Sequence, residues 1–153
     1  WCYDNDESNC KKYGRLYNWE TAVKACPAGW HLPGTAEWDS LMVAANGRRS
    51  YGEDIRADYY LDAGKRLKST TGWNDFYDEG VNGTDDYGFS AMPGGEYGYN
   101  IGSFDDVGDR GYWWSATEIG SGGAYFRNID NFDHVFEYGA DKERGFSVRC
   151  VRN

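Results

Sequence analysis

Two histidines, His31 and His134, are the side chains of this chain best suited to act as general bases. A nucleophilic serine or cysteine needs such a base, held in place by a third group. His31 lies in the string Gly-Trp-His-Leu-Pro just before a predicted helix, where we expect it to hydrogen-bond the backbone of a tight turn. His134 begins a predicted strand, where a surface or ligand-contacting role is favoured. Because the chain has 25 acidic residues, some carboxylate pair is inevitable and gives no specific signal for hydrolysis. No catalytic residue is predicted, and we expect the protein not to be an enzyme.

A recognition surface is predicted after the Gly122-Gly123 turn, where a flat aromatic ring is combined with short polar side chains. Saccharide recognition uses this mixture, as do many protein paratopes. The alternative is an ordinary solvated edge of a sheet. The predicted ligand-contacting residues are Tyr125, Arg127, Asn128, Asp130, Asn131, Asp133 and His134.

A cation site is the third candidate, in an acid-rich run over residues 75–86 that contains no Lys or Arg. Calcium takes six to eight oxygen ligands, commonly from carboxylates, Asn side chains and loop carbonyls. Asn82, Asp85 and Asp86 are therefore predicted to hold a structural calcium that orders this loop. The alternative is a solvated acidic loop, and no cofactor is predicted to be required.

The four cysteines, Cys2, Cys10, Cys26 and Cys150, include no Cys-x-x-Cys pair and show no zinc spacing. An even number in a loop-rich, aromatic chain favours two disulfides formed in an oxidising compartment, with reduced, buried cysteines as the alternative. Three pairings are possible. We favour Cys2–Cys10, which closes a small loop, and Cys26–Cys150, which ties the first predicted helix to the last strand.

Two helices are predicted from apolar spacing. The first spans residues 19–26, where apolar residues recur at i, i+3, i+4 and i+7, and Pro27 ends it. The second spans residues 35–45, with Thr35 as its N-cap. Its apolar stripe consists of Trp38, Leu41, Met42 and Ala45. A weaker pattern predicts a short helix over residues 55–61.

Beyond residue 64 the sequence changes to short strands separated by Gly-rich and Asn/Asp-rich turns. Strands are predicted at residues 89–92, 111–115, 124–129, 134–138 and 146–151. Trp113 and Trp114 are adjacent in one of them, so their side chains point to opposite faces and both are expected to be mainly structural. Helices followed by strands predict one α+β domain over residues 1–153, with an antiparallel sheet.

The net charge of −9 argues against binding to nucleic acid or to an anionic membrane surface, both of which need clustered cations. No apolar run approaches the roughly 20 residues that span a bilayer, so no membrane-spanning segment is predicted. Without an initiator Met or a leader, the chain is expected to be a mature or trimmed form.

Several segments, taken together and in order, resemble the Fibrobacter succinogenes major paralogous domain, a family of exported bacterial domains. Among them are Tyr-Gly-Arg-Leu-Tyr-Asn-Trp at residues 13–19 and Gly-Tyr-Trp-Trp-Ser-Ala-Thr-Glu at residues 111–118. The other matching segments are residues 26–33, 36–38, 88–95 and 145–151. The same strings resemble the formylglycine-generating-enzyme group, whose fold is C-type-lectin-like, although this chain lacks that group's pair of late redox-active cysteines.

The resemblance implies a loop-rich, disulfide-stabilised, C-type-lectin-like fold, with two helices packed on short, twisted antiparallel sheets. It also implies a secreted or cell-surface bacterial protein that binds rather than catalyses. In the retroelement-diversified proteins that share this fold, the corresponding late segment carries the ligand-contacting positions. The leading hypothesis is an adhesion module for polysaccharide or for a surface protein. The alternative is a structural subunit that self-assembles into a surface filament or pilus-like appendage.

Overall fold

Helix α3 (Thr35–Ala44) shows how the sequence sets local structure in this computed structural model, which describes residues 1–45, 47–51, 58–75, 80–98 and 102–153. Gly34 caps the helix, and its N–H donates to Oε2 of Glu37 at 2.9 Å. The predicted cap, Thr35, is instead the first helical residue. Trp38 and Met42, one turn apart, are buried on the inner face, as the apolar stripe predicted.

The remaining helices are short: a 3₁₀ helix η1 (Tyr3–Asn5), α1 (Glu7–Tyr13), α2 (Trp19–Ala22) and α4 (Ala63–Leu67). The strands are β1 (Trp30–His31), β2 (Arg48–Tyr51), β3 (Asp58–Leu61), β4 (Gly94–Gly98), β5 (Ser103–Val107), β6 (Gly111–Ile119), β7 (Gly123–Ile129), β8 (Val135–Asp141) and β9 (Val151–Arg152). The described part of the chain is thus an α+β structure, as predicted.

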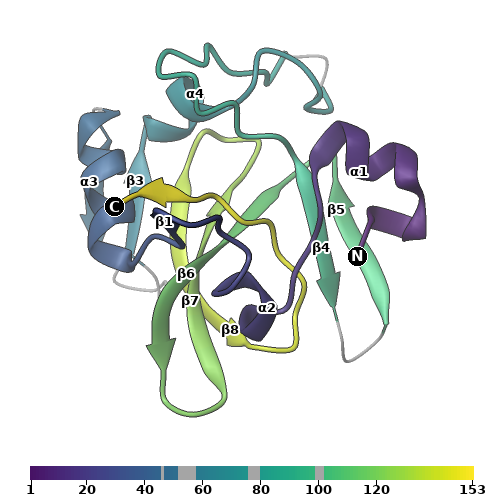
Figure 1. Cartoon of the computed structure of the whole chain (residues 1–153). Helices are drawn as coiled ribbons and strands as arrows, with labels where there is room; N and C mark the ends of the chain where they lie inside the picture. Colours follow the sequence, from purple (N-terminus) through teal and green to yellow (C-terminus); the bar gives the residue numbers. More distant parts are fainter. Residues whose placement is uncertain (46, 52–57, 76–79, 99–101) are drawn as a thin grey trace.

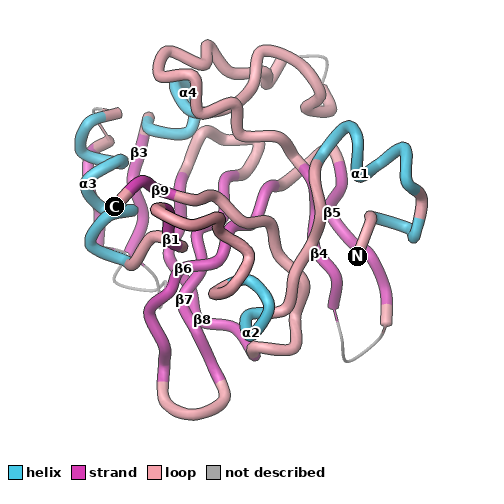
Figure 2. The backbone as a smooth tube through the Cα atoms, in the orientation of Figure 1, coloured by secondary structure: helices cyan, strands magenta, loops and turns pink. Residues whose placement is uncertain are grey.

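Seven of the strands form one sheet in the order β2-β3-β8-β7-β6-β4-β5. All neighbours are antiparallel except β4 and β6, which are parallel. The β6–β7 hairpin projects from the bottom of the molecule in Figure 1, and α3 lies at one side. Long loops between α4 and β4 cover the opposite end (Figure 2).

A second, two-stranded sheet joins the C-terminal end of the chain to residues 30–31, because β1 pairs with β9. The Cys26–Cys150 disulfide lies at the same junction, and Cys2–Cys10 closes a small loop at the start of the chain. Both predicted pairings are therefore confirmed, and no cysteine is free.

The large sheet separates two buried clusters. One contains Trp38, Met42 and Trp113, and the other contains Trp19, Trp114 and Phe146. Trp113 and Trp114 are both buried and lie in different clusters, which confirms that alternation along the strand makes both structural.

Several elements differ from the prediction. Helix α1 was not predicted, because none of its residues is buried and its sequence therefore shows no apolar stripe. Residues 58–61 form strand β3 rather than part of a helix over 55–61, since Tyr59 and Tyr60 pair with Phe136 and Val135 of β8; residues 55–57 lie outside the described part. The predicted strand over 89–92 is reduced to one bridge at Ala91.

Candidate functional site

The stretch that was predicted to contact ligand is divided between the two faces of the sheet. Tyr125 and Arg127 share a face with Ile129, which lies in the core cluster under α3. Asn128 and Asp130 belong to the opposite face. One flat ligand therefore cannot contact all seven predicted residues at once.

Arg127 is part of the internal structure. Its side chain is 1% exposed and forms ion pairs with Asp39 of α3 (2.7 Å) and with Glu137 of β8. Asn128 is also buried, and its Nδ2 donates to the carbonyl oxygen of Gly111 at 3.2 Å. Arg127 thus joins β7 to α3 and β8, and Asn128 joins β7 to β6. Buried polar side chains are nearly always hydrogen-bonded in this way.

The loop from Asp130 to His134 is held in one conformation by its own side chains. Oδ1 of Asp130 accepts hydrogen bonds from the backbone N–H of Phe132 (2.9 Å) and of His134 (3.2 Å). Burial raises the pKa of Asp130, and the nearby His134 and these N–H donors oppose that rise. The turn presents the ring of Phe132 to solvent, with 60% of the residue exposed.

A buried lysine anchors this loop from below. The ammonium group of Lys68 is fully buried, is ion-paired with Asp133 and donates to the carbonyl oxygen of Asn131 at 3.4 Å. The N–H of Gly64 donates to the carbonyl oxygen of Asp133 at 2.9 Å. A Cβ at position 64 would lie 2.5 Å from that oxygen, so this close approach requires glycine. The loop is therefore held in place by contacts with Lys68 and Gly64.

Five rings form a continuous row beside this loop, and we call them the aromatic row: Tyr59, Phe132, His134, Phe136 and Tyr138. Their neighbouring ring centroids are 5.6–6.4 Å apart. Four of the rings are partly exposed, and Phe132 is the most exposed. At the Tyr138 end the row continues into the core, because the ring centroids of Tyr138 and the buried Phe126 are 5.9 Å apart.

Polar groups flank the aromatic row. The hydroxyl of Tyr112 donates to Asp106, which also pairs with Arg110 at 3.5 Å. Burial and the Asp106 carboxylate raise the pKa of Tyr112, so this hydroxyl stays protonated. Asp109, in the same turn as Asp106 and Arg110, accepts hydrogen bonds from Asn74 (3.2 Å) and Asn131 (3.5 Å). The turn over residues 106–110 thus brings hydrogen-bonding groups close to the apolar row.

Of these residues, the sequence prediction named Asp130, Asn131, Asp133 and His134 and missed Tyr59, Phe132, Phe136 and Tyr138. The alternation of His134, Phe136 and Tyr138 at every second position was a readable signal, because residues two apart share a face of a strand. Tyr59 joins them through the pairing of β3 with β8, which no local pattern shows.

The residues predicted to hold a cation are engaged with the protein. Oδ1 of Asn82 accepts from the N–H of Trp73 at 3.1 Å. The carboxylate of Asp85 accepts from both the N–H (2.6 Å) and the hydroxyl of Ser90. In the parts of the chain that the structure describes, no three His, Cys, Asp or Glu side chains come together as metal ligands. Calcium binding at these residues stays a prediction, and residues 76–79 of the acidic run lie outside the described part.

His31 joins two parts of the fold. Its Nδ1 lies 2.6 Å from Oδ1 of Asn153 and its Nε2 lies 2.8 Å from Oε1 of Glu37. The hydrogen bonds to Asn153 and then to Glu37 raise the pKa of His31 above its ordinary value of 6.5. Its partners are therefore two side chains rather than the backbone of a turn.

These features define a disulfide-bonded α+β domain with a preorganised, partly exposed aromatic surface. Among the described residues, no helix is long and apolar enough to cross a membrane. The family described as the Fibrobacter succinogenes major domain matches residues 1–152, and the chain belongs to that family. No curated protein and no solved structure matches the chain.

Proposed function

We propose that this domain is a non-catalytic binding module that holds a polysaccharide chain along the aromatic row. The observation that carries the proposal is the run of five contacting, partly exposed rings on one face of the sheet. The C–H face of a pyranose ring is apolar and packs against an aromatic ring, whereas its hydroxyl groups need hydrogen-bond partners.

The geometry of the row supports an extended ligand better than a single sugar. Phe132 lies at one end and Tyr138 at the other, with His134 and Phe136 between them. Successive sugar rings along a chain can each contact a different side chain. At the margin, Asp109 and Asp130 each use Oδ1 to accept hydrogen bonds from the protein, which leaves Oδ2 of each carboxylate for a sugar hydroxyl.

We place the domain outside the cell, secreted or at the cell surface. Two disulfides support this location, because such bonds persist in oxidising compartments and are rare in the cytosol. The acidic net charge of −9 keeps such a domain away from anionic surfaces.

The proposed scaffold is C-type-lectin-like. Three features support it: β1 pairs with β9 at the C-terminal end of the chain, the Cys26–Cys150 disulfide lies beside that pairing, and helices α2 and α3 pack beside the large sheet. Long loops between α4 and β4, visible at the top of Figure 1, agree with this architecture.

Pull-down on a panel of insoluble neutral polysaccharides, followed by calorimetry with the matching oligosaccharides, tests the proposal. Phe132→Ala is expected to weaken binding at least about tenfold, because it removes the most exposed ring of the row. Two ring variants serve as controls. Tyr87→Ala removes a ring that is 48% exposed and lies outside the row, and Tyr125→Ala removes one on the other face of the sheet.

Binding that Phe132→Ala abolishes and both controls preserve would support the proposal. No binding to any glycan, together with association of the domain in concentrated solution, would overturn it and favour the filament subunit. Binding that is lost in Tyr125→Ala but kept in Phe132→Ala would place the site on the α3 face of the sheet and contradict the aromatic row as the site.

A further inference from the structure

A pocket with a volume of about 490 Å³ lies where the end of helix α1 meets the closing segment of the chain. Pockets of about 300–1,000 Å³ commonly hold small ligands. Its walls come from residues 12–15 and Tyr17 on one side, from Ser90 and Met92 on another, and from residues 147–150. It shares no residue with the aromatic row.

The charge of this pocket is opposite to that of the protein. The chain has 25 acidic and 16 basic residues. The residues lining the pocket nevertheless include Lys12, Arg15 and Arg149 and contain no Asp or Glu. We call it the basic pocket.

Arg149 is held rigidly at the wall of the basic pocket. Its Nη2 donates to the carbonyl oxygen of Ser90 at 3.0 Å, and its guanidinium lies 5.0 Å from the centroid of the Phe89 ring. Asp85 is the acid that acts on Arg149 electrostatically, but its carboxylate already accepts two hydrogen bonds from Ser90. The guanidinium is therefore fixed in place by a carbonyl and a ring.

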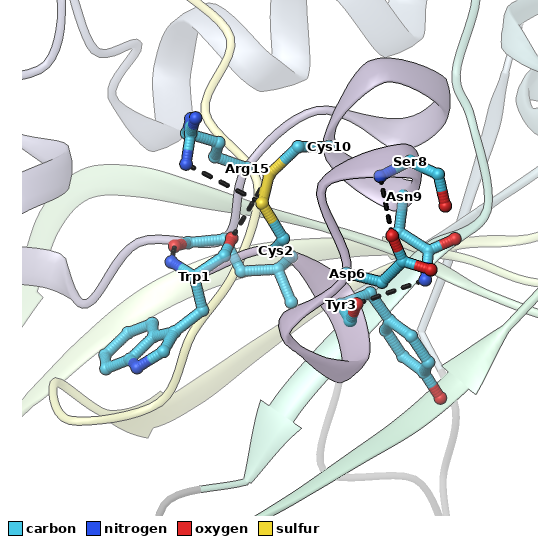
Figure 3. The surroundings of a disulfide bond; sticks show 9 residues. Trp1, Cys2, Tyr3, Asp6, Ser8, Asn9, Cys10 and Arg15 are labelled. Carbon is cyan, nitrogen blue, oxygen red and sulfur yellow. Dashed lines mark hydrogen bonds between the residues drawn. A yellow bond between two sulfur atoms is a disulfide. The ribbon is translucent and has the colours of Figure 1, made fainter.

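The other two cations are also placed by neutral neighbours. Figure 3 shows Arg15 beside the Cys2–Cys10 disulfide, with its Nη1 donating to Sγ of Cys2 at 3.6 Å. The ammonium of Lys12 lies 4.6 Å from the centroid of the Tyr13 ring. Within the part of the chain that the structure describes, no acidic side chain forms an ion pair with Lys12, Arg15 or Arg149.

We propose that the basic pocket binds a carboxylate-bearing sugar of the hexuronate type. A planar guanidinium matches a carboxylate with two parallel hydrogen bonds, and two arginines are among the residues that line this pocket. Tyr13 and Tyr17 are also among the lining residues, and an aromatic ring is a suitable surface for the C–H face of a sugar. The cavity volume is sufficient for a sugar ring together with part of its neighbour in a chain.

Titration calorimetry with galacturonate, with galactose as the neutral analogue and with inorganic phosphate tests this site. We expect galacturonate to bind and galactose not to bind. Arg149→Gln and Arg15→Gln are each expected to weaken galacturonate binding about tenfold, because each removes charge-assisted hydrogen bonds. Raising the salt concentration should also weaken it.

Arg48→Gln is the matched control, because Arg48 is an exposed arginine outside the basic pocket. Arg15 lies on the surface, so Arg15→Gln tests the proposal even if Arg149→Gln disturbs the fold. The proposal is overturned if galacturonate fails to bind, if both pocket variants bind it like the parent, or if phosphate binds as tightly. Phe132→Ala should leave galacturonate binding unchanged. The proposals for the basic pocket and for the aromatic row are therefore tested independently of each other.

Discussion

Replacing Arg127 with methionine removes the cation at the centre of an internal ion-pair network. The Arg127 side chain is 1% exposed, and its carboxylate partners Asp39 and Glu137 are 32% and 18% exposed. Removing one partner of a buried ion pair costs about 3–5 kcal/mol, because the remaining charge is left uncompensated. Water reaches both remaining carboxylates in part, so we expect a loss of about 3 kcal/mol, near the lower end of that range.

Urea denaturation followed by tryptophan fluorescence measures this loss. For a slope of about 2 kcal/mol per M, the midpoint should fall by about 1.5 M. Arg48→Met is the matched control, because Arg48 and its partner Asp62 are 74% and 64% exposed. An exposed pair contributes about 0–1 kcal/mol, so the control should move the midpoint by less than about 0.5 M.

The same variant distinguishes a structural Arg127 from a ligand contact. Because Arg127 belongs to the α3 face of the sheet, folded Arg127→Met should retain the glycan binding of the parent. A stability loss no larger than that of Arg48→Met, combined with lost binding, would refute the internal role and restore Arg127 to the ligand site.

Four further outcomes are expected. Replacing Cys26 and Cys150 with serine should lower the unfolding free energy by about 5 kcal/mol in urea, because the bridge closes a separation of 124 residues; a loss below about 2 kcal/mol would contradict this. Because the pKa of His31 is raised in the folded state, its protonated ring contributes fully to the free energy of unfolding below pH 6.5, and this contribution is lost as pH rises through the folded-state pKa. His31→Gln should therefore lower Tm more at pH 5.5 than at pH 8.5, and equal losses at the two pH values would contradict a stabilising role of the charged ring. Gly64→Ala should displace the loop that carries Phe132 and weaken glycan binding in calorimetry, whereas unchanged affinity would show that the loop tolerates the methyl group. Calcium bound at Asn82, Asp85 and Asp86 should raise Tm by several degrees, and chelator should reverse the rise; an unchanged Tm would contradict this site and leave the oxygens of Asn82 and Asp85 only their hydrogen bonds within the protein.

The sequence was informative where a residue's environment depends on near neighbours. Apolar spacing located α3, and the alternation of Trp113 and Trp114 placed them correctly on opposite faces. The favoured cysteine pairing was also confirmed, although the sequence allowed three pairings and the Cys26–Cys150 bridge spans 124 residues. A local rule was sufficient for the helix and for the two tryptophans, but not for this long bridge.

The candidate site was less predictable, because strand pairing builds it. Alternation along β7 sends Tyr125 and Asp130 to different faces, although the two lie close together in sequence. Tyr59 joins the aromatic row only through the β3–β8 pairing. The anchor Lys68 comes from 65 residues before its partner Asp133, and no motif marks it. Such contacts are set by tertiary packing.

The most direct test of the central claim is NMR mapping of a bound neutral oligosaccharide on the labelled domain. A neutral oligosaccharide is used because it has no carboxylate for the basic pocket, so its shifts report on the aromatic row alone. We predict that the largest amide shifts fall at Tyr59 and over residues 130–138, and that they disappear in Phe132→Ala. Shifts confined to the α3 face around Tyr125, or to no contiguous surface, would contradict the assignment of the aromatic row as the polysaccharide site.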